Sequence, residues 1–311
     1  MKKQVNVAAA VITRPDGSFL LGQRAPDTFY PGYWEFPGGK VEKDETVREA
    51  LIRELHEELG ITVRSAWPWI TRDHVYEHAN VRLHFFFVTD WEGEIEAKVH
   101  TSLVWQKVDS TSVGPMLPAN APVLKALRLP HVMGVSNATE LGVDAQLAAL
   151  DKALAKGLRL VQIREGWLEP EIRLEFARQV VTRCRAVGAL ALVNGEASFA
   201  KQIDADGLHL ASVRLAIIDE RPNFAWVGAS CHSRTELERA AALGLDYALL
   251  GPVCETASHP GAPALGWKRF SEWIADLPMP VLAIGGVSPD ALTTAREAGA
   301  HGIAAIRSLW I

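Results

Sequence analysis

The chain has 311 residues, of which 48% are apolar, so it has the length and the hydrophobic content for two domains with separate cores. Its formal net charge of −5 argues against a nucleic-acid polymer as partner, whereas a free nucleotide stays compatible if a metal ion screens its phosphates. The three cysteines are odd in number and lack metal-site spacing, which excludes a disulfide framework and favours a reducing compartment.

The N-terminal segment predicts a strand rather than a signal peptide. Its apolar run, from Val5 to Ile12, is short and leads directly into a turn at Pro15-Asp16-Gly17. A second strand, Phe19–Gly22, returns from this turn, so the pattern predicts a β-hairpin. No run in the chain is long enough to cross a membrane, and we therefore expect a cytoplasmic protein without a membrane partner.

A helix is predicted from Val47 to Leu59. The polar segment Lys43-Asp44-Glu45-Thr46 precedes it, and Gly60 ends it. Apolar residues recur at three- and four-residue steps and form one stripe; they are Ala50, Leu51, Leu55 and Leu59. Four further strands and a closing helix are expected in this half, over residues 62–67, 69–76, 81–91 and 105–108 and over residues 122–128.

Three glutamates share one face of this helix, because Glu54, Glu57 and Glu58 are spaced i, i+3 and i+4. Like charges in this arrangement repel each other, which destabilises an isolated helix. A hard divalent cation such as Mg²⁺ reverses the effect, since it takes oxygen ligands and works together with substrate phosphates. The alternative is a solvated acidic face, which is the usual role of an isolated Glu-Glu pair.

The spacing around these glutamates resembles the Nudix box at every defined position, namely Gly39, five residues, Glu45, seven residues, Arg53-Glu54-Leu55, one residue, Glu57-Glu58, one residue, and Gly60-Ile61. The resemblance implies a loop–helix–loop on an α/β/α sandwich that hydrolyses nucleoside diphosphates linked to another group. It implies a Mg²⁺ site, with Mn²⁺ as an alternative, whose ligands are the Gly38 carbonyl, Glu54, Glu57 and Glu58. Arg53 would orient these glutamates, and Glu45 is either structural or an auxiliary to the metal or the base.

The N-terminal half as a whole looks most like the MutT-type 8-oxo-dGTP diphosphatases. The matching pieces are Gln23-Arg24-Ala25, Glu35-Phe36-Pro37-Gly38-Gly39-Lys40-Val41-Glu42 and Leu117-Pro118-Ala119-Asn120. The resemblance implies that Arg24 contacts the small-molecule nucleotide and that Asn120 reads its base. It implies a pocket lined by Phe29, Glu35, Phe36 and Pro37. The implied reaction converts 8-oxo-dGTP to 8-oxo-dGMP and pyrophosphate, which removes oxidised nucleotides before DNA replication.

An asparagine suits the oxidised base for a physical reason. Guanine presents two acceptors, O6 and N7, on its Hoogsteen edge, whereas N7 of 8-oxoguanine carries a proton. The Asn120 amide offers one donor and one acceptor, so it matches the oxidised edge and mismatches the normal one. The alternative is that Asn120 caps a helix that starts at Ala121-Pro122. One departure from the resemblance is Val99, which stands where a further glutamate is expected and leaves the metal count and the general base open.

Residues 129–311 predict a second domain, after a first domain over residues 1–128. Leu129-Pro130 marks the join, and apolar strands then alternate with helices such as Glu169–Val187 and Arg234–Leu243. Eight strands are expected, over residues 131–135, 158–163, 190–193, 207–210, 226–229, 247–250, 281–284 and 302–306, which predicts a (β/α)₈ TIM barrel. The last barrel helix is expected to be missing, with Leu309-Trp310-Ile311 covered by the N-terminal domain or by a second copy in a homodimer. Deleting residues 309–311 is then expected to lower stability or solubility.

The loops of this half resemble the thiamine-phosphate synthase/TenI superfamily. The matching pieces are Val161-Gln162-Ile163-Arg164-Glu165, Ala205-Asp206-Gly207-Leu208-His209-Leu210, Gly228-Ala229-Ser230-Cys231-His232-Ser233, Gly251-Pro252-Val253 and Ala283-Ile284-Gly285-Gly286-Val287. The resemblance implies that Gly285 and Gly286 hold a phosphate through their backbone.

The chain departs from a thiamine-phosphate synthase where that enzyme needs acids and lysines. Val193-Asn194-Gly195 and Ala211-Ser212-Val213-Arg214 replace the expected Asp positions, and Gly166 and the loop from Cys254 to Pro260 lack the expected lysines. The resemblance therefore fits a TenI-like thiazole tautomerase better, with His232 as acid and base. Three alternatives stay open: a structural role for His232, a barrel that is a non-catalytic binding module, and a Nudix domain that hydrolyses a thiamine-related pyrophosphate.

Overall fold

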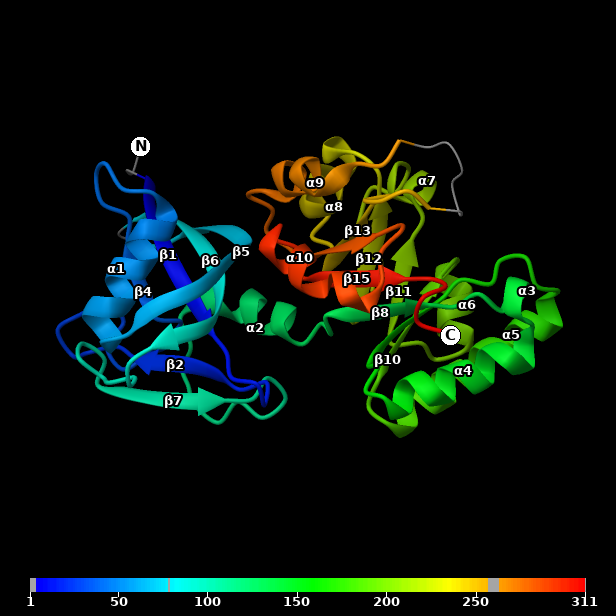
Figure 1. Ribbon diagram of the computed structural model, residues 1–311, viewed down its shortest axis with the longest axis horizontal. Coiled ribbons are helices and arrows are strands. Elements are labelled where there is room, and N and C mark those ends of the chain that lie inside the picture. Colours follow the sequence, from blue (N-terminus) through cyan, green and yellow to red (C-terminus); the bar gives the residue numbers. More distant parts are fainter. Residues whose placement is uncertain (1–3, 78, 257–262, 311) are drawn as a thin grey trace. The chain divides into compact units, whose positions relative to one another are not determined.

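The computed structural model describes residues 4–77, 79–256 and 263–310. The chain divides into two compact units (Figure 1): Met1–Arg128 together with Ala275–Pro278, and Leu129–Ile274 together with Met279–Ile311. Among the helices of the described residues, none combines the length and the apolar character that crossing a bilayer requires. Of the sequence-based expectations, those for residues 257–260 and Ile311 lie outside the described residues.

The first unit contains a mixed four-stranded sheet and a three-stranded antiparallel sheet. The four-stranded sheet has the order β4-β1-β6-β5, with β1 at Gln4–Ile12, β4 at Gly38–Lys40, β5 at Thr62–Val75 and β6 at Asn80–Glu92. The three-stranded sheet has the order β3-β2-β7, with β2 at Phe19–Gln23, β3 at Trp34–Glu35 and β7 at Ser102–Gln106. β1 and β6 run parallel over nine residue pairs, from Gln4 opposite Asn80 to Ile12 opposite Val88.

Each face of the four-stranded sheet builds its own core, because side chains alternate along a strand. Ala8, Ala10 and Ile12 pack in one cluster with the buried leucines of α1 (Val47–Leu59). Ala9 and Val11 point to the other face, where α2 (Ala121–Leu127) packs in the second cluster. The arrangement is a helix on each side of the strands, which confirms the expected sandwich.

The helix α1 has the predicted bounds because capping residues mark both of its ends. Thr46 accepts a hydrogen bond from the Glu49 backbone while the Glu49 carboxylate accepts from the Thr46 backbone, a complete capping box. At the other end Gly60 adopts a left-handed conformation (φ 73°), and its N–H donates to the His56 carbonyl. The carboxylate-bearing helix is therefore fixed at both ends.

Two expectations for this unit are wrong. β1 and β2 do not pair as a hairpin, because they belong to different sheets. The turn between them is closed by a bridge between Thr13 and Phe19 and by a hydrogen bond from the Arg14 N–H to the Ser18 carbonyl. The segment expected as two strands, residues 62–67 and 69–76, is the single strand β5, which continues through Pro68. Register shifts between Pro68 and Thr71 show that β5 absorbs the proline as an irregularity in its pairing with β6.

The second unit is a closed parallel barrel of eight strands, as expected. The strands are β8 (Val132–Val135), β9 (Leu160–Ile163), β10 (Leu190–Asn194), β11 (Gly207–Leu210), β12 (Trp226–Cys231), β13 (Tyr247–Leu250), β14 (Val281–Ile284) and β15 (Gly302–Ala305). Most strand residues are buried, which explains why the strands read as apolar runs rather than alternating patterns.

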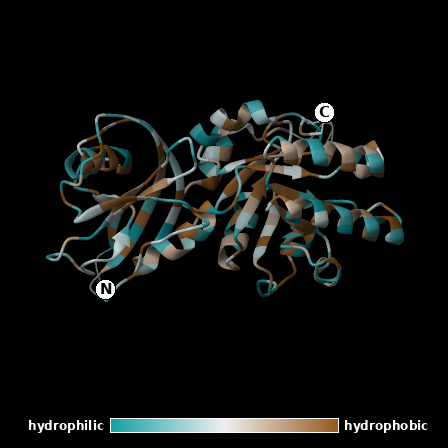
Figure 2. Ribbon diagram, turned by 90° about the horizontal axis from the view of Figure 1, so that it is seen from below, coloured by the Kyte–Doolittle hydropathy of each residue, from teal (hydrophilic) through white to brown (hydrophobic). Residues whose placement is uncertain are grey.

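Helices surround the barrel strands (Figure 1). They are α3 (Ala138–Leu141), α4 (Val143–Ala155), α5 (Pro170–Ala186), α6 (Ala197–Gln202), α7 (Ser212–Leu215), α8 (Arg234–Ala242), α9 (Gly266–Ile274) and α10 (Leu292–Glu297). The short 3₁₀ segment η2 (Pro289–Ala291) precedes α10, and another, η1 (Pro118–Asn120), belongs to the first unit. Hydrophilic and hydrophobic residues alternate along these helices (Figure 2), as expected for elements with one face on a barrel.

The chain after β15 packs back onto the barrel itself. Within residues 306–310 no helix follows the last strand. Trp310 is 8% exposed, and its indole Nε1 donates to the Val135 carbonyl at 2.8 Å. A Cβ on Gly134 would lie 2.6 Å from the Trp310 ring, so the glycine in β8 makes room for the indole. The expectation that the N-terminal domain or a second copy covers Trp310 is therefore wrong, because β8 of its own barrel covers it.

Candidate functional site

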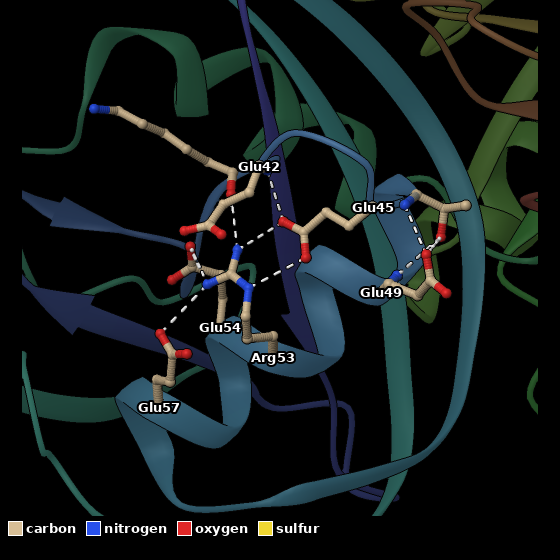
Figure 3. A network of polar contacts seen from close by, with 8 residues as sticks. Glu42, Glu45, Glu49, Arg53, Glu54 and Glu57 are labelled. Atoms are coloured by element: carbon tan, nitrogen blue, oxygen red, sulfur yellow. Dashed lines mark hydrogen bonds and ion pairs between the residues drawn. The ribbon is translucent and has the colours of Figure 1, made fainter.

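Arg53 is the centre of a polar network on α1 (Figure 3). Its Nη2 donates to Glu45 Oε1 at 2.8 Å and to the Lys40 carbonyl at 3.0 Å. Its Nη1 lies 3.1 Å from Glu54 Oε1 and 3.3 Å from Glu57 Oε2. The guanidinium therefore holds the helix, its acidic face and the preceding loop in one arrangement.

Glu45 is a structural partner of Arg53. Its two oxygens accept from Nε and Nη2 of Arg53, the fork geometry that makes Arg–carboxylate pairs specific. Glu45 also accepts from the Glu42 backbone at 2.7 Å, and the Arg53 hydrogen bonds lower the pKa of its carboxyl. With both oxygens committed in this way, Glu45 ties the loop to the helix.

Glu54 and Glu58 are the more buried carboxylates of the acidic face, whereas the Glu57 side chain is 58% exposed. Burial raises the pKa of Glu58 to about 7 against the opposing effects of His100 and of the Gly38 N–H, which donates to Glu58 Oε2 at 3.0 Å. Burial also raises the pKa of Glu54. Two neighbouring carboxylates with raised pKa values form a site that favours a positive ligand.

The two glycines before the helix are required by close approaches. A Cβ on Gly38 would stand 2.1 Å from the Ala8 carbonyl, and its φ of 138° disfavours any side chain. A Cβ on Gly39 would stand 2.2 Å from the Glu54 carboxylate. Glycine at both positions lets the Glu54 and Glu58 carboxylates lie directly against the backbone of this loop.

The residues fit a divalent cation by their chemistry. The donor set consists of carboxylates and a backbone carbonyl, the hard oxygen ligands that Mg²⁺ prefers. Partly buried like charges are costly unless a cation compensates them, and here the pKa values of Glu54 and Glu58 report that cost. In the described part of the chain, no three His, Cys, Asp or Glu side chains already converge as a closed metal site. Glu54 and Glu57 instead lie near Arg53.

The expected nucleotide contacts Arg24 and Glu35 form a second ion pair. Arg24 Nη1 lies 2.6 Å from Glu35 Oε2, and its Nε donates to the Phe29 carbonyl at 2.7 Å. Phe29 is 66% exposed. The Phe36 ring packs in the core against Phe19 and Phe85 instead. Pro37 beside it is also buried.

Asn120 is buried, and the structure rules out the helix-capping alternative for its side chain. It precedes α2, but its side chain makes no capping hydrogen bond. Its Nδ2 instead donates weakly, at 3.5 Å, to the Trp34 carbonyl. The accepting carbonyl belongs to the residue that directly precedes Glu35 in β3.

His100 is a site residue that sequence reasoning missed. Its side chain is 3% exposed, and its Nε2 lies 3.6 Å from Glu35 Oε1. Burial alone lowers the pKa of His100, but Glu35 and the charge of Glu58 outweigh burial and leave that pKa raised. Val99, where a glutamate was expected, is 52% exposed. A Cβ on Gly22 would lie 2.3 Å from the His100 ring, so the glycine makes room for the imidazole, but nothing in the sequence links the two positions.

The barrel contains a cavity of about 410 Å³ at the carboxyl ends of its strands. Its polar lining includes Gln162, Asn194, Ser230 and His232, and its charged lining includes Arg164. Trp167, which is 87% exposed, also lines it. The lining thus combines apolar walls with a few polar groups, as small-molecule sites do.

The expected residues His232, Gly285 and Gly286 lie at this end of the barrel. His232 Nδ1 donates to the Gly251 carbonyl at 2.7 Å, which leaves Nε2 as an acceptor while the ring is neutral. Gly285 lines the cavity and a neighbouring pocket of about 300 Å³, which Gly286 and Arg307 also line. Both glycines have positive φ, and a Cβ on either would lie under 3 Å from the segment Pro252–Glu255.

The cavity does not fit the metal ion that a thiamine-phosphate synthase needs. None of its described lining residues is Asp or Glu. Arg214, on ground where an acid was expected, forms an ion pair with Glu196. The carboxylate of Glu165 is also committed elsewhere: it accepts from the Ala138 and Thr139 backbone N–H groups and caps α3. The site therefore offers neutral hydrogen-bonding groups and one guanidinium in place of a metal-binding acid pair.

Comparisons with known proteins identify a family for each half of the chain. The family described as thiamine monophosphate synthase matches residues 132–309, and that described as NUDIX domain matches residues 2–127. The first half is 40% identical over 124 residues to a CTP pyrophosphohydrolase of Escherichia coli (strain K12), covering 40% of this chain and 91% of that protein.

Two further relatives extend this picture. An 8-oxo-dGTP diphosphatase of Proteus vulgaris is 40% identical over 97 residues, which cover 31% of this chain and 87% of that protein. A putative thiamine-phosphate synthase 2 of Aquifex aeolicus (strain VF5) is 33% identical over 183 residues, which cover 58% of this chain and 97% of that protein. The chain therefore belongs to the NUDIX domain family through residues 2–127 and to the thiamine monophosphate synthase family through residues 132–309.

Proposed function

We propose that the Nudix domain hydrolyses oxidised purine nucleoside triphosphates, 8-oxo-dGTP in particular, to the monophosphate and pyrophosphate. The observation that carries the proposal is Asn120, a buried amide without a capping role whose hydrogen-bond partner, the Trp34 carbonyl, directly precedes Glu35 of the Arg24–Glu35 pair. One donor and one acceptor match the O6 and N7–H edge of 8-oxoguanine and mismatch the same edge of guanine. Similarity to an 8-oxo-dGTP diphosphatase supports this choice.

The reaction requires the protein to bind the phosphates of the substrate and to position a water molecule. Glu54, Glu57, Glu58 and the Gly38 carbonyl would hold Mg²⁺, which neutralises phosphate charge and helps to activate water when bound. Arg53 fixes these carboxylates through its contacts to Glu54 and Glu57. Arg24, kept in place by Glu35, would contact the nucleotide.

The test compares 8-oxo-dGTP, dGTP, CTP and thiamine pyrophosphate as substrates, with released pyrophosphate or phosphate as the readout. We expect the highest kcat/KM for 8-oxo-dGTP and loss of turnover in the Glu54→Gln/Glu57→Gln variant. Asn120→Ala should remove the preference for 8-oxo-dGTP over dGTP. Recognition through hydrogen bonds can produce a preference of up to about 10⁴-fold. Retention of that preference in Asn120→Ala would overturn the role of the amide. Turnover of thiamine pyrophosphate alone would overturn the nucleotide assignment.

A cytosine nucleotide is the second candidate substrate. One relative that matches the Nudix domain over 124 residues is a CTP pyrophosphohydrolase. Cytosine presents an N4–H donor beside the N3 acceptor, so the Asn120 amide satisfies this base as well. A higher kcat/KM for CTP than for 8-oxo-dGTP in the same panel, lost in Asn120→Ala, would establish this candidate.

For the barrel we propose metal-independent proton transfer on a phosphorylated heterocycle, as in thiazole tautomerases. The absence of Asp and Glu from the described cavity lining supports it, as does the free Nε2 of His232. His232→Gln should abolish thiazole turnover, while Ser233→Ala, a change next to it in the chain, should retain most of it. Turnover that survives in His232→Gln would contradict the proposal.

A further inference from the structure

Three side chains of the barrel form a buried hydrogen-bond chain. The proton transfer proposed for His232 does not use these three side chains. His209 Nδ1 lies 2.9 Å from the Tyr247 hydroxyl, and His209 Nε2 lies 2.8 Å from Ser230 Oγ. His209 and Tyr247 are fully buried, and Ser230 lines the cavity. The chain thus leads from the barrel interior to the ligand side of the cavity.

The strand register builds this chain from neighbouring positions. His209 on β11, Gly228 on β12 and Tyr247 on β13 stand in one row across three adjacent strands. A Cβ on Gly228 would lie 2.1 Å from the Tyr247 ring, so glycine lets the phenol cross β12 and reach His209. Ser230 follows Gly228 by two residues and shares its face of the strand. The glycine is therefore the element of sequence that makes the contact possible.

The direction of the protons follows from counting donors. Burial lowers the pKa of His209 to about 3, so its ring is neutral and carries one N–H. Among the described residues, His209 is the one hydrogen-bond partner of the Tyr247 hydroxyl. A buried hydroxyl that did not donate would leave its O–H unpaired, at a cost of about 1–3 kcal/mol. The Tyr247 O–H therefore donates to Nδ1, and the ring proton resides on Nε2.

We propose that Tyr247 and His209 are positioning residues that fix the Ser230 hydroxyl as a hydrogen-bond donor into the barrel cavity. Nε2–H of His209 donates to Ser230 Oγ, so the serine cannot turn its own proton back toward the imidazole. In the described part of the chain Ser230 Oγ has no other partner. The Ser230 O–H points to the ligand, which must present an acceptor such as a ring nitrogen or an anionic oxygen.

The decisive measurement is the tautomer of His209, which needs no ligand. Nitrogen-15 spectra of the full chain labelled at its 10 histidines give the protonation of each ring nitrogen. His209→Gln identifies the signal by its loss. We expect protonated Nε2 and unprotonated Nδ1, and in Tyr247→Phe we expect a mixture of both tautomers, because the ring loses its fixed donor. A wild-type His209 protonated on Nδ1 would overturn the proposal.

A binding measurement then tests the effect on the ligand and rests on the proposed function of the barrel. With thiamine monophosphate as probe, Ser230→Ala should weaken binding about tenfold, the worth of one hydrogen bond. Tyr247→Phe should weaken it by a smaller factor. Ser271→Ala, the same change on α9 outside the cavity lining, should change it less than about twofold. Equal effects of Ser230→Ala and Ser271→Ala would overturn the donor role of Ser230. No binding to the wild type would overturn the proposed barrel ligand while the tautomer result stands.

Discussion

Gly22 and His100 pack as one unit at the hydrolase site. A Cβ on residue 22 would stand 2.3 Å from Cδ2 of the imidazole, which is itself held near Glu35. We expect Gly22→Ala to displace the ring and to lower the free energy of unfolding by about 1–3 kcal/mol, as overpacking of a core does. Urea denaturation of the purified variant measures this change.

The matched control removes the clash. In a His100→Ala background the space is free, so Gly22→Ala should cost less than about 0.5 kcal/mol there. The double-mutant cycle isolates the contact between the two positions. Equal costs in both backgrounds would show that Gly22 is required for its backbone and not for the imidazole.

The acidic residues of this site were predictable from the sequence, whereas His100 was not. Glu54, Glu57 and Glu58 follow helical spacing inside a motif, so their shared face follows from helix geometry alone. His100 lies in an irregular segment before β7, where no period indicates which side chain turns inward. The partner that fixes it, Gly22, is 78 positions earlier in the chain and signals only that space is needed.

The capping box of α1 supports the element that carries the carboxylates. The Thr46 hydroxyl accepts from the Glu49 backbone at 3.2 Å. Thr46→Ala should lower the free energy of unfolding by about 1 kcal/mol, the usual cost of losing such a cap. Thr46→Ser retains the hydroxyl and should stay within about 0.5 kcal/mol of the wild type. Thermal unfolding of both variants checks the pair, and equal melting temperatures for Ala and Ser would contradict the capping role.

Elements with chemical stop signals were predicted well, and connections between elements were not. α1 has its predicted bounds, since Thr46 and Gly60 mark its ends. The hairpin from β1 to β2 was wrong because the turn at residues 15–17 fixes only a local reversal. β1 instead pairs with β4 and β6, a choice made by the cores on its two faces rather than by the turn.

At the scale of the whole molecule, Trp310 secures the last strand of the barrel. Its buried indole packs against Gly134 and donates to the Val135 carbonyl, so it joins the end of the chain to β8. Trp310→Ala should lower the free energy of unfolding by about 3–5 kcal/mol, as loss of a large buried aromatic does. Trp310→Phe should lower it less, since part of the ring volume remains. Denaturation of both variants tests the order, and an unchanged Trp310→Ala would refute the role.

The architecture of the barrel was predictable because eight apolar runs repeat between amphipathic helices. Its interior chemistry was not, because it depends on register. His209 and Gly228 are 19 positions apart in the sequence, and so are Gly228 and Tyr247. The three residues meet only when β11, β12 and β13 align. The packing of Trp310 against β8 was likewise not predicted, because a glycine at position 134 does not indicate in the sequence which side chain packs against it.

Buried neutral histidines should make the stability of the barrel depend on pH. Burial lowers the pKa of His209 to about 3 and that of His131 to about 4, against about 6.5 in an unfolded chain. Below about pH 6.5 the unfolded chain binds protons that the folded barrel does not, so acid favours unfolding. This contribution to stability is complete above about pH 6.5 and is lost as pH falls toward 4, at up to about 1.4 kcal/mol per pH unit for each histidine.

Urea denaturation at pH 7, 6 and 5 measures the slope of stability against pH. His209→Gln should make the slope shallower than that of the wild type, because one acid-sensitive group is gone. Val213→Ala, a change at an exposed residue of the same barrel that carries no titratable group, should leave the slope unchanged. Taking differences between variants cancels Glu58, whose raised pKa acts with the opposite sign in the other unit. An identical slope for His209→Gln and the wild type would mean that the His209 imidazole is protonated, or exposed to solvent, in the folded barrel.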